Sequence, residues 1–297
     1  MNIFKKRYRL FIIGVLLITA GVISGCSRFE LGYRYADWII IYQLDSYFDL
    51  NGDQKDKAED LVDDLVSWHK QNELPDYVHY ASTVRNHIDA GLTRKDVSDL
   101  YDRYLGLRLR LYNKLIRKAG TFLAMVNAEQ LSHLQDRMEE DNQKIEKQVV
   151  LPLPERMKIR EEQMVEQFEE WIGDLTDRQE KMIEEFNRTL PVWSKDRLAF
   201  RKAKQKEFLT EVEKARFDSG KIEYFLNETM VRDWELERTP YHRKMRHSGE
   251  LLRGFLLTMY QTLTSGQKDY LLSRLDDIIT EFREIVSEDK ARMEKAG

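Results

Sequence analysis

Residues 94–124 read RKDVSDLYDRYLGLRLRLYNKLIRKAGTFLA, and apolar side chains recur in them every three or four positions. The recurring positions are Val97, Leu100, Tyr104, Leu107, Leu111 and Leu115. This spacing places them along one face of an α-helix and leaves charged side chains on the other faces. A second segment repeats the pattern with Leu271, Leu275, Ile278, Phe282 and Ile285. Both segments therefore predict long amphipathic helices that pack against other helices.

The rest of the chain has the composition of helices. Glycine and proline occur only 14 and 5 times in 297 residues, and 34% of the residues are charged. No segment alternates polar and apolar residues between turn signals, as a half-buried strand would. We therefore predict an all-α protein, an elongated multi-helix bundle of about ten helices. The predicted helices span residues 35–48, 53–72, 75–90, 94–124, 128–149, 154–172, 177–189, 194–217, 220–237, 241–262 and 265–294.

One segment stands out as a candidate hinge between two halves. Pro152 and Pro154 lie within the run Val149-Val150-Leu151-Pro152-Leu153-Pro154, where they interrupt helical hydrogen bonding and favour extended backbone. This predicts an N-terminal helical half over residues 26–150 and a C-terminal half over 151–297. One continuous helical domain remains the alternative.

The N-terminus looks like a bacterial lipoprotein signal. Basic side chains at Lys5, Lys6, Arg7 and Arg9 precede an apolar run over residues 10–23, which leads to Ser24-Gly25-Cys26. This order predicts a signal peptide over residues 1–25, cleavage between Gly25 and Cys26, and acylation of Cys26. An uncleaved membrane anchor is the alternative, but 10–23 is shorter than the roughly 20 residues that span a bilayer.

The predicted anchor and the charge narrow the location and the partners. Ser27 follows the cysteine where an aspartate would favour retention in the inner membrane, so we expect the outer membrane, with the protein facing the periplasm. Removing the four basic side chains of residues 1–25 from a chain of net charge −4 leaves a charge near −8. An acidic balance without a basic block argues against nucleic acid as a partner. With the only cysteine acylated, no disulfide is expected.

A short sequence recurs at predicted helix starts. Leu175-Thr176-Asp177-Arg178-Gln179 and Leu263-Thr264-Ser265-Gly266-Gln267 share the form Leu-Thr-x-x-Gln, and looser copies lie at 50–54, 92–96 and 126–130. The spacing predicts capping boxes, in which the Thr or Asn side chain accepts from the N–H three residues later. The Gln side chain in turn accepts from the backbone N–H of the cap residue.

The Leu-Thr-x-x-Gln pentads also resemble the paired motif of the Spy and CpxP periplasmic proteins, which are all-helical. The resemblance implies a protein that cradles unfolded clients or senses envelope stress. It rests on Leu175, Thr176 and Gln179 and on the matching Leu263, Thr264 and Gln267. The alternative is that these helices simply begin with favourable caps.

A second resemblance covers the first part of the predicted mature chain. The runs 35–38 (YADW), 44–50 (LDSYFDL) and 68–77 (WHKQNELPDY), together with Gln54, are similar to an uncharacterised family of Gram-negative envelope lipoproteins, a domain of unknown function. This likeness implies lipoprotein status and carries over no catalytic residue.

Candidate reactive groups are few. His69 and Glu73 are four residues apart on one predicted helical face, which is the beginning of a general-base arrangement, but no nucleophile or third partner accompanies them. Asp49, Asn51 and Asp53 have the spacing of the first calcium-loop ligands, but the loop glycine and the bidentate glutamate are missing. We therefore expect no catalytic residue, no metal site and no cofactor.

Aromatic residues follow the predicted anchor closely. Tyr35, Trp38 and Tyr42 flank the apolar run 39–41. Tyrosine and tryptophan favour membrane interfaces, but a helix with this many apolar residues is also typical of a buried core. Both interpretations remain open at this point.

Together these features favour a non-enzymatic, lipid-anchored periplasmic protein that binds another envelope protein or a nonnative polypeptide. A structural spacer of the outer membrane is the main alternative. A hydrolase acting on cell-wall or lipid material is a third, and it requires a cleft with an acidic side chain beside His69.

Overall fold

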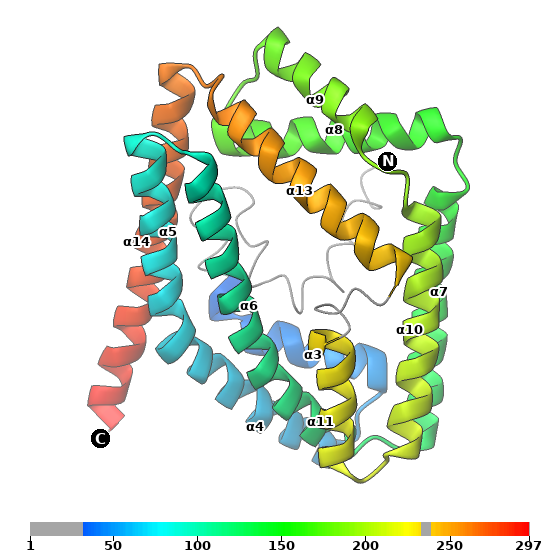
Figure 1. Ribbon diagram of the computed structural model, residues 1–297. Helices are drawn as coiled ribbons and strands as arrows, with labels where there is room; N and C mark the ends of the chain where they lie inside the picture. The colour runs from blue at the N-terminus through cyan, green and yellow to red at the C-terminus, as the bar shows by residue number, and fades with distance from the viewer. Residues whose placement is uncertain (1–31, 233–238, 297) are drawn as a thin grey trace.

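The computed structural model describes residues 32–232 and 239–296, and this part of the chain contains helices and turns but no β-strand (Figure 1). The prediction of an all-α multi-helix fold is confirmed. The described elements are α3 (Ala36–Phe48), α4 (Gly52–Trp68), η2 (His69–Glu73), α5 (Leu74–Ala90), α6 (Arg94–Leu123), α7 (Ala128–Val149), α8 (Leu153–Ile172), α9 (Asp177–Thr189), α10 (Ser194–Lys214), α11 (Ser219–Asn227), η3 (Glu228–Arg232), α13 (Pro240–Tyr260) and α14 (Ser265–Ala296).

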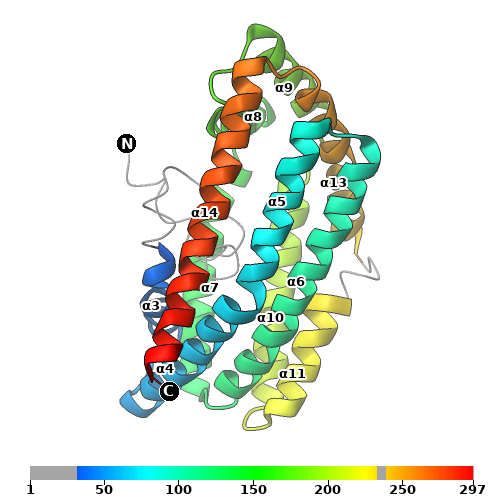
Figure 2. The same ribbon diagram turned by 90° about the vertical axis from the view of Figure 1, so that its left-hand side faces the viewer.

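The helices are arranged as an open frame in the view of Figure 1. Helices α5, α6 and α14 form its left side, α3, α4 and α11 its base, α7 and α10 its right side, and α8 and α9 its top, while α13 crosses it diagonally. In Figure 2, α3 and α11 lie at opposite edges of the molecule.

Two four-helix units share one pattern of contacts. In the first, α3 and α4 are joined by a turn, as are α6 and α7, and α3 packs on α7 while α4 packs on α6. In the second, the same arrangement involves α8 with α9 and α13 with α14, where α8 packs on α14 and α9 on α13. The same arrangement of two helix pairs therefore occurs twice in the fold.

Each unit has its own apolar core. The larger core includes Phe48, Val62, Ile116, Leu134 and Ile222 and is extended by α10 and α11, which follow the predicted hinge in sequence. The smaller core consists of Ile172, Ile183, Phe186, Phe255 and Met259. In it, the rings of Phe186 and Phe255 stack with their centroids 4.1 Å apart.

The C-terminal helix connects the two units. Helix α14 packs along α5, where Arg85 Nε lies 2.9 Å from Asp276 Oδ1. At the upper end of this contact, the Tyr260 hydroxyl donates to the carbonyl of Ile88 and the Lys268 ammonium to that of Asp89, both at 2.9 Å. The beginning and the end of the described chain are thus held together.

The predicted break between helices 53–72 and 75–90 is wrong. Helices α4 and α5 are continuous through the π-helical turn η2, in which the N–H of Leu74 donates to the carbonyl of His69 five residues earlier. Pro75 lies in the first turn of α5, where its missing N–H is tolerated. The π-turn absorbs the irregularity, so that the chain bends without leaving the helix.

One other predicted helix is too long, and one is described only in part. The predicted helix 194–217 ends at Lys214, and Phe217 has a φ of 70° that a right-handed helix cannot contain. The predicted helix 220–237 begins as α11 and continues without a break through the π-helical η3 to Arg232. Its last part, residues 233–238, lies outside the described residues.

The N-terminal predictions also fall outside the described residues. They comprise the signal peptide over 1–25, the cleavage site at Gly25 and the acylation of Cys26. From residue 32 onward, excepting 233–238 and 297, no helix is long and apolar enough to cross a bilayer.

Helices α6 and α11 approach each other most closely at Gly120. A Cβ atom at this position would lie 2.3 Å from Glu223 Cγ and 3.1 Å from the Ser219 carbonyl oxygen. Gly106, on the same helix, has nothing within 4 Å of the equivalent position. The two glycines therefore form a matched pair, one required by packing and one not.

Gly120→Ala should lower the free energy of unfolding by about 1–3 kcal/mol, because the methyl group would push α11 away from α6. Gly106→Ala should raise it by up to about 1 kcal/mol, because alanine is the better helix former. Urea denaturation measures both values. Equal shifts in the same direction would contradict the close packing of α6 on α11.

Candidate functional site

Glutamine side chains join the turns of each four-helix unit. We call each of these contacts a crossed glutamine pair: Gln54 with Gln130 in the first unit and Gln179 with Gln267 in the second. All four glutamines are the third residue of their helix and form capping boxes. The four cap residues are Asn51, Asn127, Thr176 and Thr264.

The second pair is the more deeply buried. Gln179 is fully buried and Gln267 is 7% exposed, and each donates from Nε2 to the other's Oε1 at 2.9 Å. Their Oε1 atoms also accept from the backbone N–H of their own caps, at 2.9 Å for Thr176 and 3.0 Å for Thr264. Each capping box is therefore completed by the other.

The remaining donors reach across to the opposite turn. Gln179 Nε2 lies 3.3 Å from the carbonyl oxygen of Thr262, and Gln267 Nε2 donates to that of Asp174 at 2.8 Å. Each of these carbonyls belongs to the residue two positions before the partner's cap. The pair thus joins the turn before α9 to the turn before α14.

The first unit repeats this geometry with asparagine caps. Gln54 donates to Gln130 at 3.0 Å and Gln130 to Gln54 at 2.6 Å. Gln54 also donates to the carbonyl of Met125 at 2.7 Å, and Gln130 to that of Asp49 at 3.1 Å. These carbonyls again lie two residues before the partner's cap, so both units are closed by the same network.

In the four pentads that contain the paired glutamines, the first residue is apolar and packs against a core. Val126 is 1% exposed in the larger core, and Leu50 packs against the same core. Leu175 and Leu263 pack against the smaller core. The pentad thus combines a core contact, a helix cap and a bond to a second turn. The copy at Thr93 forms a capping box but lacks the bond to a second turn, because Asp96 stands in place of glutamine and its carboxylate has no N–H to donate.

A second polar cluster surrounds the π-turn. The Tyr33 hydroxyl lies 2.5 Å from His69 Nδ1 and is hydrogen-bonded to it. Glu73 is 2% exposed and accepts two hydrogen bonds from Arg110, at 3.0 and 3.1 Å. Arg110 also donates to Asp76 at 2.5 Å. Residues 33, 69 and 73 are therefore fixed by partners on other elements.

This arrangement lacks a carboxylate that would orient His69 as a general base. Glu73 is neutralised by Arg110, and His69 is engaged by Tyr33 rather than by a carboxylate. Burial, with a smaller contribution from the charge of Lys70, lowers the pKa of His69 from 6.5 to about 4. Burial also raises the pKa of the Tyr33 phenol well above its usual value. At neutral pH the cluster contains a neutral imidazole and a neutral phenol, which suits a structural contact.

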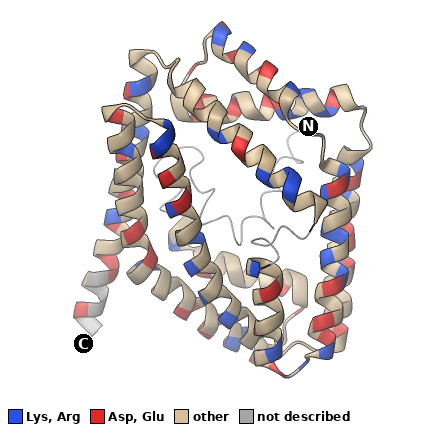
Figure 3. Cartoon of the chain, in the orientation of Figure 1, with Lys and Arg blue, Asp and Glu red and all other residues tan. Residues whose placement is uncertain are grey.

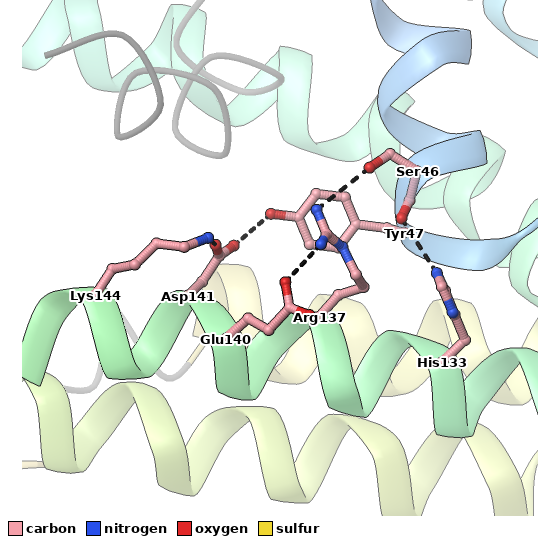
Figure 4. Close-up of polar contacts among 7 residues, drawn as sticks. All are labelled: Ser46, Tyr47, His133, Arg137, Glu140, Asp141 and Lys144. Atoms are coloured by element: carbon pink, nitrogen blue, oxygen red, sulfur yellow. Dashed lines mark hydrogen bonds and ion pairs between the residues drawn. The ribbon is translucent and has the colours of Figure 1, made fainter. Parts of the chain in front are cut away.

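A third cluster holds α3 on α7 (Figure 4). The Tyr47 hydroxyl donates to Asp141 at 2.5 Å, and Lys144 donates to the same carboxylate at 2.6 Å. The Arg137 guanidinium lies over the Tyr47 ring, 5.7 Å from its centroid. Burial, followed by the hydrogen bond to Asp141, raises the pKa of Tyr47, so its hydroxyl remains a donor. These contacts fix the orientation of α3.

The residues considered for metal binding are not assembled around an ion site. Asp49 ends α3 in a left-handed conformation, and its carbonyl accepts from Gln130. His133 is four residues after Glu129, a spacing that two metal ligands on one helical face can have, and its Nε2 lies 3.3 Å from the carbonyl oxygen of Ser46. Among the described residues, no group of three or more His, Cys, Asp or Glu side chains could hold a metal ion.

Comparison with known proteins identifies the family. The model of a family of unknown function, DUF6279, matches residues 46–242, which is more than half of the chain. This chain belongs to the DUF6279 family. The match confirms the predicted relation to an uncharacterised domain family. The lipoprotein character inferred for that family and the resemblance to Spy and CpxP stay predictions. No curated protein and no solved structure matches the chain.

The DUF6279 match relates directly to the glutamine network. It contains both members of the first crossed glutamine pair and Gln179 of the second, and it ends before Gln267. The sequence predicts the pentads as helix caps. It predicts neither the bonds between them nor the pairing of the buried Glu73 with the half-exposed Arg110. The repetition of glutamine at the third helical position was the available signal.

The buried imidazole makes stability depend on pH. Unfolded histidine takes up a proton near pH 6.5, whereas His69 in the folded protein does so only near pH 4. The free energy of unfolding should therefore decrease as the pH is lowered from about 6.5 to about 4, by up to about 3 kcal/mol. His69→Gln, which keeps a hydrogen-bonding side chain beside Tyr33, should remove this loss. Urea denaturation at pH 8, 6 and 4.5 measures it, and parallel profiles for both proteins would contradict the assignment.

Proposed function

We propose that the protein is a lipid-anchored component of the bacterial envelope, exposed to the periplasm, that binds another envelope protein or a nonnative polypeptide and catalyses no reaction. The anchor is the acylated Cys26 suggested by the signal-like N-terminus. The lack of catalysis is supported by the contact of His69 Nδ1 with a phenol and by the pairing of Glu73 with Arg110, because neither contact is that of a carboxylate-assisted histidine base.

The observation that carries the binding role is a group of exposed apolar side chains at one corner of the frame. We call Val150, Leu153 and Val192 the corner patch; they are 76%, 42% and 45% exposed. Val150 and Val192 lie on the segments that join α7 to α8 and α9 to α10, and Leu153 is the first residue of α8. These segments are neighbours, because Arg156 donates to Ser194 at 2.5 Å and Arg160 to the carbonyl of Pro191 at 3.4 Å.

The corner patch is surrounded by helices that carry many charged side chains. Figure 3 shows Lys, Arg, Asp and Glu interspersed over the described helices, including those that meet at this corner. Apolar side chains that gather on an otherwise charged surface are typical of protein interaction sites. A small apolar area with a charged rim suits weak, reversible contact with a partner or an unfolded segment.

The spacer function is a second candidate. The crossed glutamine pairs fix the turns of both units, and α14 fastens one unit to the other. A rigid frame of this kind would suit a protein whose dimensions matter more than its contacts. The corner patch is the observation that supports the binding role over the spacer.

The corner patch provides a test. The double substitution Val150→Asp and Val192→Asp should abolish most of the ability of the purified mature protein to delay aggregation of an unfolded client, and also its photo-crosslinks to envelope proteins. Both side chains are exposed, so stability should change by less than about 0.5 kcal/mol.

Tyr224→Asp is the matched control, since Tyr224 is 68% exposed on α11, away from the corner. It should leave both activities unchanged. A wild-type protein that neither delays aggregation nor yields a crosslinked envelope partner would refute the binding role and favour the spacer.

A further inference from the structure

One face of α3 carries an exposed aromatic stripe. Tyr35, Trp38 and Tyr42 are 51%, 64% and 58% exposed, and they are spaced by three and four residues. The rings of Trp38 and Tyr42 stack on each other, with centroids 5.6 Å apart and an angle of 17° between their planes. Ile41 and Phe48 on the same helix are buried in the larger core. Large aromatic rings are therefore exposed to solvent although the helix is well packed.

The stripe cannot turn inward. Tyr47 and Ser46 hold the far end of α3 on α7 (Figure 4). Tyr33 fixes the chain just before α3 to His69. With both ends attached, the helix presents the stripe outward at the edge of the molecule opposite α11 (Figure 2).

We infer that this aromatic stripe docks on the interfacial layer of the phospholipid membrane to which Cys26 is anchored. The inference rests on the proposed lipid anchor. Cys26 is seven positions before Tyr33, so its Cα can lie no more than about 25 Å from the point where the chain joins the helical body. The stripe begins two residues after Tyr33, so it lies within reach of the membrane that holds the anchor.

The chemistry of the stripe fits this partner. Tyrosine and tryptophan have an apolar ring and a polar group that stays hydrated, which is why they gather at the boundary between acyl chains and water. The anchor makes docking an intramolecular step, so a weak surface is sufficient.

A second copy of the chain fits less well. Three rings that are about half exposed offer on the order of 400 Å². A stable protein interface needs about 800 Å² from each partner. The stripe alone is too small for a dimer interface, but it is large enough to orient a protein that is already tethered.

The test uses the acylated mature protein in vesicles of phosphatidylethanolamine and phosphatidylglycerol brominated on the upper acyl chain. Bromine quenches tryptophan only on contact, and the difference between wild type and Trp38→Phe isolates the emission of Trp38. We expect this emission to shift to the blue and to lose most of its intensity. The matched control is Tyr224→Trp in the Trp38→Phe background, whose new tryptophan on α11 should remain unquenched.

Each other outcome overturns the inference in a recognisable way. Protein that floats with the vesicles while Trp38 emits as it does in water keeps its anchor but does not dock. A blue shift without quenching means that another protein molecule covers the stripe. Equal quenching at both positions means that the body lies on the membrane without preference. Protein that does not float with the vesicles lacks the anchor itself, and then the proposed function fails as well.

Discussion

The structure depends on the need of a buried glutamine amide to use all its hydrogen-bonding groups. Such an amide has two N–H donors and an oxygen that accepts twice. In each crossed glutamine pair the oxygen accepts from its own helix cap and from the partner glutamine, while the nitrogen donates to the partner and to the opposite turn. Glutamate or aspartate could not replace these donors, and an unpaired amide would cost about 1–3 kcal/mol when buried. The network is complete only when two turns meet, so it specifies which turns do.

The rest of the architecture follows from these two junctions. Each junction holds four helices around a core, and the apolar residue at the start of each of its two pentads packs against that core. Helices α5, α10 and α11 extend the first unit, and α14 joins the second unit to α5. The polar clusters around His69 and Tyr47 then fix the path of the chain just after the predicted anchor. The aromatic stripe and the corner patch are exposed because the helices that bear them are already held by other contacts.

Much of the fold can be predicted from the sequence, because helical periodicity and helix capping depend on residues that are close together in the chain. The apolar helical face in residues 94–124 and the caps at Thr176 and Thr264 each depend on residues within one or two helical turns. The crossed glutamine pairs could not be predicted, because Gln54 and Gln130 are 76 positions apart and Gln179 and Gln267 are 88 apart. Pro75 favoured a break between two helices. A π-turn takes the place of that break, and it leaves no pattern in the sequence by which it could be predicted. Exposure of Trp38 depends on where α7 and η2 hold α3, so sequence alone left both of its interpretations open.

The most direct test of the central claim is a double-mutant cycle on Gln179 and Gln267. Methionine has nearly the same shape but cannot form these hydrogen bonds, so each single substitution should lower the free energy of unfolding by about 2–4 kcal/mol. If the two amides satisfy each other, Gln179→Met combined with Gln267→Met should cost at least about 1 kcal/mol less than the sum of the singles. Costs that add to within about 0.5 kcal/mol would show that the glutamines act only as separate helix caps, and would contradict the account.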